Sequence, residues 1–243
     1  MKKIAIVTGA SRGIGAATAT LLAEKGYAVC VNYYNAKDKA DELVEAIKKN
    51  NGTAIAVKAD MAVESDILKL FETVDKELGT VTALVNNAGT NGGIGEVENI
   101  SAARLESVFA TNVFGTFYAS REAVKRMKNN GGGNIVNVSS EAAKFGGNNL
   151  AHYAASKAAI NTFTIGFARE VAAHNIRVNA VSPGVIDTEA HAGSSPERLT
   201  NLLNSLPMKR MGRSTEVADL IYWLLTDSAS YLSGSIIPIT GSR

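Results

Sequence analysis

The chain has 243 residues, of which 46% are apolar and 20% are charged, and its formal net charge is +2. This balance excludes a disordered chain and leaves enough apolar material for a large core. The 22 glycines follow no three-residue period, which excludes a collagen-like helix. Basic residues form no dense stripe and no apolar run reaches about 18 residues, so we expect neither a nucleic acid nor a membrane as partner.

The cellular location is predicted from the start of the sequence and from cysteine usage. Met1-Lys2-Lys3 is followed by only four apolar residues, which is too few for the core of a signal peptide. The single cysteine, Cys30, cannot form an internal disulfide and is interpreted as a small buried residue. We therefore expect a cytoplasmic protein. The three histidines match no metal-binding spacing, so no metal site is expected.

Short β-rich runs alternate with longer helical segments along the whole chain. The predicted strands cover residues 3–8, 28–33, 53–58, 83–86, 134–138, 176–181 and 236–239. The predicted helices cover residues 13–25, 38–50, 64–78, 102–128, 153–174, about 197–205, and 215–225. This order predicts a parallel sheet with helices on both faces, and no break in composition divides it. We expect one doubly wound α/β domain over residues 1–243.

A glycine-rich turn joins the first predicted strand to the first predicted helix. Glycine lets backbone N–H groups approach a pyrophosphate closely, and a helix N-terminus favours negative charge. The spacing is Gly-x3-Gly-x-Gly rather than the commoner Gly-x-Gly-x2-Gly, and three glycines could also serve a purely structural turn. Their position at a strand-to-helix junction favours binding of a dinucleotide cofactor by Thr8-Gly9-Ala10-Ser11-Arg12-Gly13-Ile14-Gly15.

The end of the second predicted strand bears on the choice between NAD and NADP. An acid there would bind the ribose 2′-hydroxyl and repel a 2′-phosphate. The sequence Val31-Asn32-Tyr33-Tyr34-Asn35 contains no acid. Arg12 in the glycine turn could reach a 2′-phosphate, with Lys37 as a second candidate, although Arg12 could also be a solvated loop residue. These observations favour NADP(H) over NAD(H).

Tyr153 and Lys157 are spaced by one helical turn, so their side chains share a helix face. A free tyrosine is a poor base at neutral pH, but a nearby ammonium group favours the phenolate and lowers the tyrosine pKa. Tyrosine can then act as a general acid or base on a carbonyl or alcohol. Tyr-x3-Lys by itself is common on ordinary helices. Ser139 and Ser140, which follow the fifth strand, place a serine at the same edge of the sheet.

Asn112 lies inside a predicted helix, where asparagine is a weak helix former. It is interpreted either as an exposed or capped polar residue, or as a side chain that holds water or distorts the helix at the site.

Taken together, these motifs resemble a known family over essentially the whole chain. Their order and spacing are similar to those of the single-domain short-chain dehydrogenase/reductases, on these residues: Thr8-Gly9-x3-Gly13-x-Gly15, Asn86-Asn87-Ala88-Gly89, Asn112, Ser140, Tyr153-x3-Lys157 and Pro183-Gly184. The resemblance implies a Rossmann-type sheet of about seven parallel strands. Sugar dehydrogenase-like and 3-oxoacyl-carrier reductase-like members look most similar. The ending Thr240-Gly241-Ser242-Arg243 departs from the more usual acid-Gly-Gly.

The resemblance also implies a role for each site residue. Tyr153 would be the acid/base, Ser140 would orient the carbonyl, Lys157 would bind the nicotinamide ribose and tune Tyr153, and Asn112 would complete a proton relay. Ser140 is preferred over Ser139 because its spacing to Tyr153 matches the family. The implied cofactor contacts are Gly9, Ser11, Arg12, Gly13, Ile14, Gly15, Asp60, Asn86, Ala88, Gly89, Tyr153, Lys157, Pro183, Gly184, Ile186 and Thr188.

The substrate is expected to bind on loops. Residues 187–214 form a long, mostly polar segment that suits a substrate lid, although a surface insertion would look the same. Selectivity is expected there and in residues 90–99 and 141–151. The residues that could touch a substrate are Glu141, Lys144, Phe145, Asn148 and His191, whereas His152 is expected to be structural. Small residues around helix 153–174 and the family resemblance predict a homotetramer.

Three functions are carried forward. The first is an NADP(H)-dependent dehydrogenase or carbonyl reductase that acts on a small carbonyl or alcohol. The second is a 3-oxoacyl-carrier-protein or oxoacyl-CoA reductase, which is weakened because the stretches Asn130-Gly131-Gly132 and Ala173-His174-Asn175 lack the arginines common in such reductases. The third is an NADP-binding sensor or scaffold without turnover, although such a protein would not need both Tyr153 and Lys157.

Overall fold

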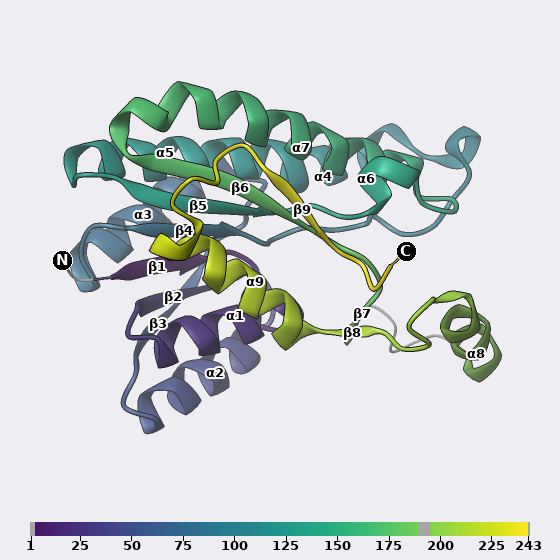
Figure 1. Cartoon of the computed structure of the whole chain (residues 1–243), viewed down its shortest axis with the longest axis horizontal. Coiled ribbons are helices and arrows are strands. Elements are labelled where there is room, and N and C mark those ends of the chain that lie inside the picture. The colour runs from purple at the N-terminus through teal and green to yellow at the C-terminus, as the bar shows by residue number, and fades with distance from the viewer. Residues whose placement is uncertain (1–2, 190–194, 243) are drawn as a thin grey trace.

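The computed structural model describes residues 3–189 and 195–242. Its main sheet has seven parallel strands in the order β3-β2-β1-β4-β5-β6-β9 (Figure 1). The strand order reverses between β1 and β4, and the carboxyl ends of the strands at such a point border a ligand-binding crevice. The strands are β1 (Ile4–Val7), β2 (Ala28–Tyr33), β3 (Thr53–Lys58), β4 (Ala83–Asn86), β5 (Gly133–Val138), β6 (Ile176–Pro183) and β9 (Ile236–Ile239).

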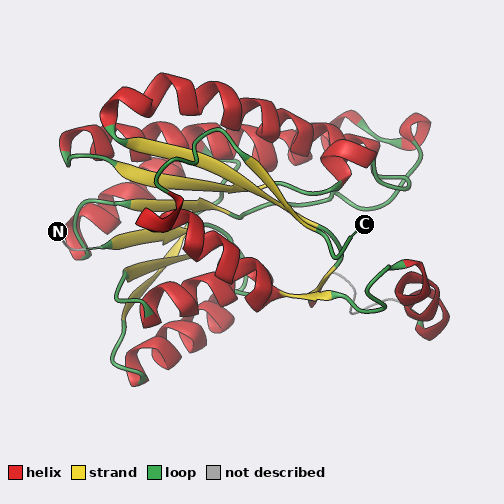
Figure 2. Cartoon of the chain, in the orientation of Figure 1, coloured by secondary structure: helices red, strands yellow, loops and turns green. Residues whose placement is uncertain are grey.

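Helices cover both faces of this sheet (Figure 2). One layer contains α1 (Gly13–Glu24), α2 (Lys37–Lys49) and α9 (Ser214–Leu225). The other contains α3 (Glu64–Glu77), α5 (Gly115–Asn129) and α7 (Ala151–Val171). The predicted doubly wound α/β fold is confirmed.

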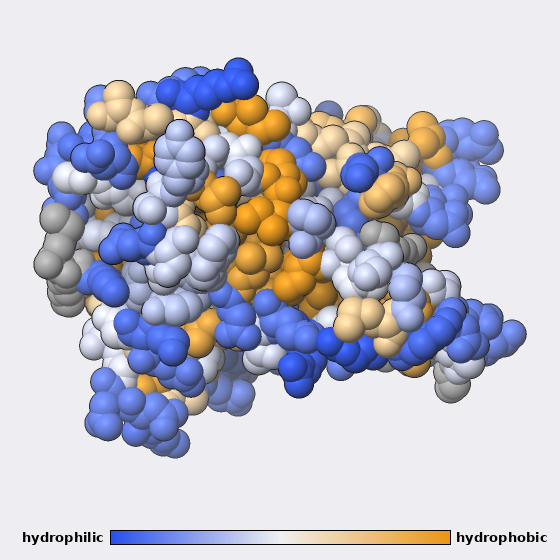
Figure 3. All heavy atoms as spheres, in the orientation of Figure 1, coloured by the Kyte–Doolittle hydropathy of each residue, from blue (hydrophilic) through white to orange (hydrophobic). Residues whose placement is uncertain are grey.

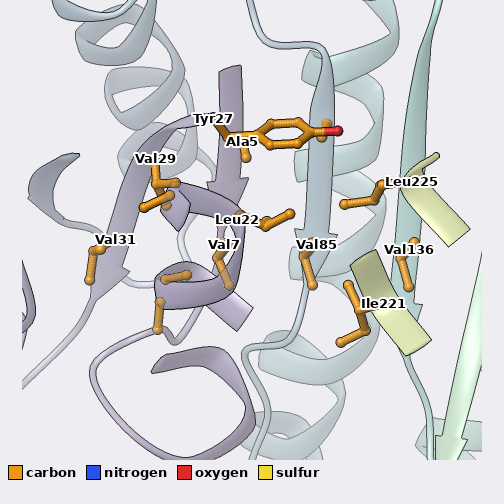
Figure 4. Close-up of a cluster of buried hydrophobic side chains, with 14 of the residues drawn as sticks. Ala5, Val7, Leu22, Tyr27, Val29, Val31, Val85, Val136, Ile221 and Leu225 are labelled. Atoms are coloured by element: carbon orange, nitrogen blue, oxygen red, sulfur yellow. The ribbon is translucent and has the colours of Figure 1, made fainter. Parts of the chain in front are cut away.

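The core lies on both sides of the sheet because successive residues of a strand point to opposite faces. In β1, Ala5 and Val7 pack toward α1 and α9 with Leu22 and Ile221 (Figure 4). Ile6 packs toward α3, α5 and α7. Every residue of β1, β2 and β4 is buried, as expected for strands covered on both faces.

The predicted helix 102–128 is wrong in its middle. It is divided into α4 (Ala102–Phe109), a π-helical turn (Ala110–Phe114) and α5. The extra residue of a π turn lets a side chain inside a helix leave the regular spacing, and such turns are frequent at functional sites. Asn112 sits in this turn and is only 1% exposed. The interpretation of Asn112 as an exposed polar residue is therefore wrong, and the distorted helix is correct.

The described parts of the segment after β6 contain two short strands and a helix. Strand β7 (Ile186–Asp187) pairs with β8 (Gly212–Arg213), and α8 (Pro196–Ser205) lies between them in the chain, close to the predicted helix 197–205. Figure 1 shows α8 standing apart from the sheet. His191 lies outside the described residues. In the described parts of the chain, no helix is long and apolar enough to cross a membrane.

Candidate active site

The glycine turn packs tightly against the carboxyl end of β4. Gly9 has a φ of +61°, which side chains disfavour, and a Cβ there would lie 2.9 Å from the Cα of Ala88. A Cβ on Gly15 would lie 2.5 Å from the Asn87 amide nitrogen and 2.6 Å from the Gly9 carbonyl oxygen. The turn therefore requires glycine at both positions, and its backbone is held where the helix N-terminus of α1 begins.

Hydrogen bonds from the residues after β4 hold this turn in place. The Asn87 amide donates to the carbonyl oxygens of Thr8 at 2.8 Å and Gly9 at 3.1 Å. The Thr8 hydroxyl accepts from the backbone N–H groups of Asn87 and Ala88 at 3.0 and 2.9 Å. Asn87, which was not among the predicted contacts, thus holds the glycine turn in place.

Asn32 is a second residue that the sequence reasoning missed. It is buried in β2, where its side-chain oxygen Oδ1 accepts a hydrogen bond from the Gly9 backbone N–H at 3.0 Å. Its amide donates to the carbonyl oxygens of Val57 at 3.3 Å and Ala59 at 3.1 Å. A polar residue inside a fully buried apolar strand is the signal that could have identified it, because such a group is hydrogen-bonded.

Two cations, Arg12 and Lys39, meet at the carboxylate of Glu189, and one of them differs from the sequence prediction. Arg12 is exposed, and its Nη1 lies 3.6 Å from Oε2 of Glu189. Lys39 pairs with the other oxygen of the Glu189 carboxylate. Lys37, the predicted second candidate, is instead paired with Asp41 one turn along α2. The helical spacing selects that local partner for Lys37 and leaves Lys39 facing the turn.

Asp60 and Asn86 also follow strands at this edge. Oδ1 of Asp60 accepts a hydrogen bond from the Ala62 backbone N–H at 2.8 Å, which fixes the bend after β3. The Asn86 amide donates to the Ser120 hydroxyl at 3.0 Å and to Oδ1 of Asn137 at 2.9 Å. Asn86 therefore ties the end of β4 to α5 and β5.

Tyr153, Ser140 and Lys157 converge at the carboxyl end of β5. The Ser140 side chain lies beside the Tyr153 phenol, where it acts to lower the Tyr153 pKa. Lys157 is 5% exposed, its Nζ donates to the Val138 carbonyl oxygen at 2.7 Å, and it lies 5.9 Å from the centre of the Tyr153 ring. The Ser139 hydroxyl instead donates to the Lys157 carbonyl oxygen at 3.3 Å. This arrangement agrees with the choice of Ser140 over Ser139.

Burial controls the acidity of these groups. It raises the pKa of Tyr153, and the Ser140 side chain opposes this only in part. The pKa of Tyr153 is therefore raised rather than lowered as predicted, because burial removes water from around the phenol. Burial also lowers the pKa of Lys157 to about 8. Near neutral pH the site therefore holds a protonated phenol beside an ammonium group that gives up its proton readily.

Asn112 connects this site to the loop that begins at Thr90. Its amide nitrogen donates to the Ser156 hydroxyl and to the Thr90 carbonyl oxygen, both at 2.9 Å. Its Oδ1 accepts from the Thr90 backbone N–H at 2.8 Å. A Cβ on Gly89 would lie 3.2 Å from this oxygen and 3.3 Å from Nζ of Lys157. A side chain at position 89 would therefore crowd both Asn112 and Lys157.

The segment from Pro183 to Thr188 runs along the crevice. The Gly184 N–H donates to the Ile239 carbonyl oxygen at 3.0 Å, and a Cβ on Gly184 would lie 3.3 Å from Oε2 of Glu141. Thr188 packs beside Gly13 of the glycine turn. The segment therefore lies close both to Glu141, which follows Ser140, and to the glycine turn. Among the predicted turn residues, Ser11 is half-buried and Ile14 packs on the core.

The expected substrate loops lie near this crevice. Phe145, on the short helix α6 (Ala142–Phe145), is 63% exposed, and the Lys144 ammonium group lies 5.0 Å from its ring centre. His152 is buried, and its Nε2 is hydrogen-bonded to the Asn91 carbonyl oxygen at 2.8 Å, as expected of a structural residue.

The chain is similar to known oxidoreductases over nearly its full length. Residues 9–241 match a protein family described as enoyl-(acyl carrier protein) reductase. The chain is 48% identical over 245 residues to the uncharacterized oxidoreductase YgfF of Escherichia coli K12, with 99% of each covered. It is 36% identical over 242 residues to the 3-oxoacyl-[acyl-carrier-protein] reductase FabG of Staphylococcus epidermidis RP62A, with 99% of this chain and 98% of the relative covered.

A solved structure has the same fold. The fold matches that of a 7α-hydroxysteroid dehydrogenase complexed with NADH and 7-oxo glycochenodeoxycholic acid, with a TM-score of 0.93 and 35% identity. The match covers 98% of this chain and 93% of that one. With the strand order and the matched sequence, these likenesses establish that the chain is an oxidoreductase of the short-chain dehydrogenase/reductase family.

Proposed function

We propose that this protein transfers a hydride between a nicotinamide cofactor and a small carbonyl compound or secondary alcohol, with Tyr153 as the general acid/base. The cofactor, when bound, supplies or accepts the hydride at its nicotinamide C4 atom. The observation that carries the proposal is the convergence of Tyr153, Ser140 and Lys157, with the Lys157 Nζ 5.9 Å from the centre of the Tyr153 ring.

The acidities of the site residues suit proton transfer to a carbonyl oxygen. The raised pKa of Tyr153 keeps its phenol protonated at neutral pH, so it can donate a proton as negative charge grows on the substrate oxygen. Ser140 orients that oxygen beside the phenol. The Lys157 ammonium stabilises the phenolate that results. Asn112 is a positioning residue, since it links Ser156 on α7 to Thr90.

The residues present fit a dinucleotide, and we assign NADP(H) as the preferred cofactor. The glycine turn offers backbone N–H groups at the start of α1, where a side chain would fill the available space. Arg12 and Lys39 both face the carboxylate of Glu189, and so place two cations near the end of β2. No acid lies between Val31 and Asn35 to repel a 2′-phosphate.

We further propose that residues 1–243 act as one domain and that residues 187–214 cover the substrate. A cavity of about 210 Å³ lies between the β7–β8 pair and the end of β9. Its apolar lining favours an apolar portion of the substrate, and includes Val185, Ile186, Leu206, Met208 and Ile239.

A homotetramer is proposed from two separate surfaces. On α5 and α7, Phe117 is 45% exposed, and its ring centre lies 3.9 Å from that of Phe163 in a tilted pair. Phe163 in turn stacks on Phe167. Strand β9 is an edge of the sheet, and apolar side chains gather over this part of the face in Figure 3. An unpaired apolar edge favours pairing with another chain. Two distinct self-complementary surfaces generate a tetramer with twofold axes.

The acid/base assignment is tested with Tyr153→Phe, which removes the hydroxyl and keeps the ring. We expect ketone or aldehyde reduction by NADPH to fall roughly 100-fold or more, since general acid catalysis contributes on that scale. The measurement is the rate of NADPH oxidation over a panel of ketones, aldehydes and sugars. Dissociation constants for NADPH should change far less than turnover, because the Tyr153 ring is kept and only its hydroxyl is removed.

Tyr231→Phe is the matched control, because Tyr231 is fully exposed. It should leave turnover unchanged. Wild-type turnover by Tyr153→Phe would overturn the mechanism. Tight NADPH binding by the wild type with no turnover on the whole panel would favour a sensor or scaffold over an enzyme.

Reduction of an oxoacyl thioester is a second candidate, favoured by the similarity to FabG. The stretches at residues 130–132 and 173–175 lack the arginines expected of such reductases, so we rank it second. Higher kcat/KM on acetoacetyl thioesters than on free ketones would reverse this order.

A further inference from the structure

A carboxylate lies between the two cations that we assign to the cofactor. Nη1 of Arg12 is 3.6 Å from Oε2 of Glu189, and Lys39 is paired with Oε1 of the same residue. The three side chains come from the glycine turn, from the first turn of α2 and from the segment after β7. All three are about half exposed, at 60%, 47% and 51% for Arg12, Lys39 and Glu189, so a ligand can reach them.

The backbone next to Glu189 places its carboxylate over the turn. Thr188 Cγ2 lies 3.4 Å from the position of a Cβ on Gly13, so the chain passes directly beside the glycine turn. The hydrogen bond from Lys39 lowers the pKa of Glu189, so its carboxylate is ionised at neutral pH.

A fixed negative charge at this point is relevant to cofactor choice. Dinucleotide-binding folds discriminate at the ribose 2′ position, where an acid accepts a hydrogen bond from a hydroxyl and repels a phosphate. Strand β2 supplies no acid here, because Asn32 faces the glycine turn and Tyr33 ends the strand. Glu189 brings an acid to the same cations from a different segment of the chain.

We propose that Glu189 is a specificity-determining residue for the cofactor: it occupies Arg12 and Lys39 in place of a 2′-phosphate and thereby limits the preference for NADP(H). This inference rests on the proposed function, which assigns the 2′-phosphate to these cations. A 2′-phosphate must displace the Glu189 carboxylate, whereas a ribose 2′-hydroxyl can donate a hydrogen bond to it. Exposed ion pairs are weak, so the effect should be several-fold.

The experiment compares two ligands that differ only at the 2′ position, adenosine 2′,5′-bisphosphate and adenosine 5′-monophosphate. Their dissociation constants are measured by calorimetry on the full chain. Glu189→Gln should tighten binding of the bisphosphate by about three- to tenfold, because the competing charge is removed. Binding of the monophosphate should stay within about twofold of the wild type. Glu197→Gln, an exposed carboxylate on α8, is the control for net charge and should change neither constant.

Lysine variants test whether the same cations are involved. Lys39→Ala should weaken the bisphosphate, whereas Lys37→Ala, which removes the partner of Asp41, should not. In the Arg12→Ala/Glu189→Gln double variant, the gain from the glutamine should shrink, because Glu189 then competes for fewer charges.

The inference is overturned if Glu189→Gln leaves the bisphosphate constant unchanged or tightens both ligands equally. Its failure is distinct from failure of the NADP(H) assignment. If the wild type binds NADP no tighter than NAD, the assigned preference is wrong, yet a selective gain in Glu189→Gln still supports the role of Glu189. If the wild type prefers NADP and Glu189→Gln has the same dissociation constants as the wild type, only the proposed role of Glu189 is wrong.

Discussion

Lys157 lowers the stability of the fold at the site that we propose transfers a proton to the substrate. An ammonium group loses hydration when it is buried, and here it donates a hydrogen bond to the Val138 carbonyl oxygen. Its pKa falls from 10.5 to about 8 as a result. A shift of this size disfavours the folded state by roughly 3 kcal/mol when the lysine is charged.

Because the buried charge disfavours folding, we expect Lys157→Met to change the stability of the protein. The folded protein binds fewer protons at this site than the unfolded chain between pH 8 and 10.5, so the wild type gains stability as the pH rises through that window. At pH 7 the methionine variant should be more stable by roughly 2 kcal/mol, once a lost hydrogen bond of about 1 kcal/mol is allowed for.

Denaturant unfolding from pH 7 to 10.5 measures this difference. The advantage of Lys157→Met should decline above pH 8, while its catalytic turnover is lost. Lys128→Met, on the exposed end of α5, should show a difference that does not depend on pH. A constant advantage for Lys157→Met across the range would contradict the assigned cause.

At the scale of elements, the glycine turn is held by neighbouring strands rather than by its own sequence. Asn32 in β2 fixes Gly9, and Asn87 after β4 fixes Thr8 and Gly9. The conformation of the turn therefore depends on the packing of β1 between β2 and β4.

We predict that Asn32→Val loosens this turn. The change leaves the Gly9 N–H without its partner and should cost roughly 2–3 kcal/mol of unfolding free energy. Affinity for NAD and NADP should fall together by roughly tenfold, equivalent to about 1.4 kcal/mol. Calorimetry with both cofactors measures this, and thermal unfolding follows stability.

Cys30→Ala is the control for Asn32→Val, because Cys30 is buried two residues earlier on the same face of β2. It should lose stability through lost packing and keep the affinity for both cofactors. A change in the NADP constant alone in Asn32→Val would show that Asn32 acts at the 2′-phosphate and not on the turn.

At the scale of the whole molecule, the exposed aromatic surface of α5 and α7 predicts the assembly. Phe117→Asp should remove the association across this surface and leave dimers paired through the other one, since burying an unpaired charge is costly. Light scattering coupled to size exclusion measures the mass. Ala46→Asp, exposed on α2 in the opposite helix layer, should stay tetrameric. A monomeric wild type would refute the homotetramer.

Local patterns in the sequence were sufficient for the architecture. The strands, most helices and the strand-to-helix position of Gly9, Gly13 and Gly15 followed from periodicity, because apolar spacing records which faces are buried. Tyr153 and Lys157 were paired correctly because one helical turn separates them. The helix over 102–128 failed at Asn112, where contacts with Thr90 and Ser156 accompany a π turn that no local pattern marks.

Long-range contacts and burial decided the rest. Asn32 meets Gly9 across 23 residues, and Lys39 meets Glu189 across 150. The helical spacing pairs Lys37 with Asp41, whereas only the fold brings Lys39 to Glu189. The Tyr153 pKa was predicted in the wrong direction because desolvation depends on everything packed around the ring. The sequence alone therefore determined the fold and the chemical groups, whereas the tertiary structure decided their partners and acidities, because solvent exclusion and contacts between distant segments arise only on folding.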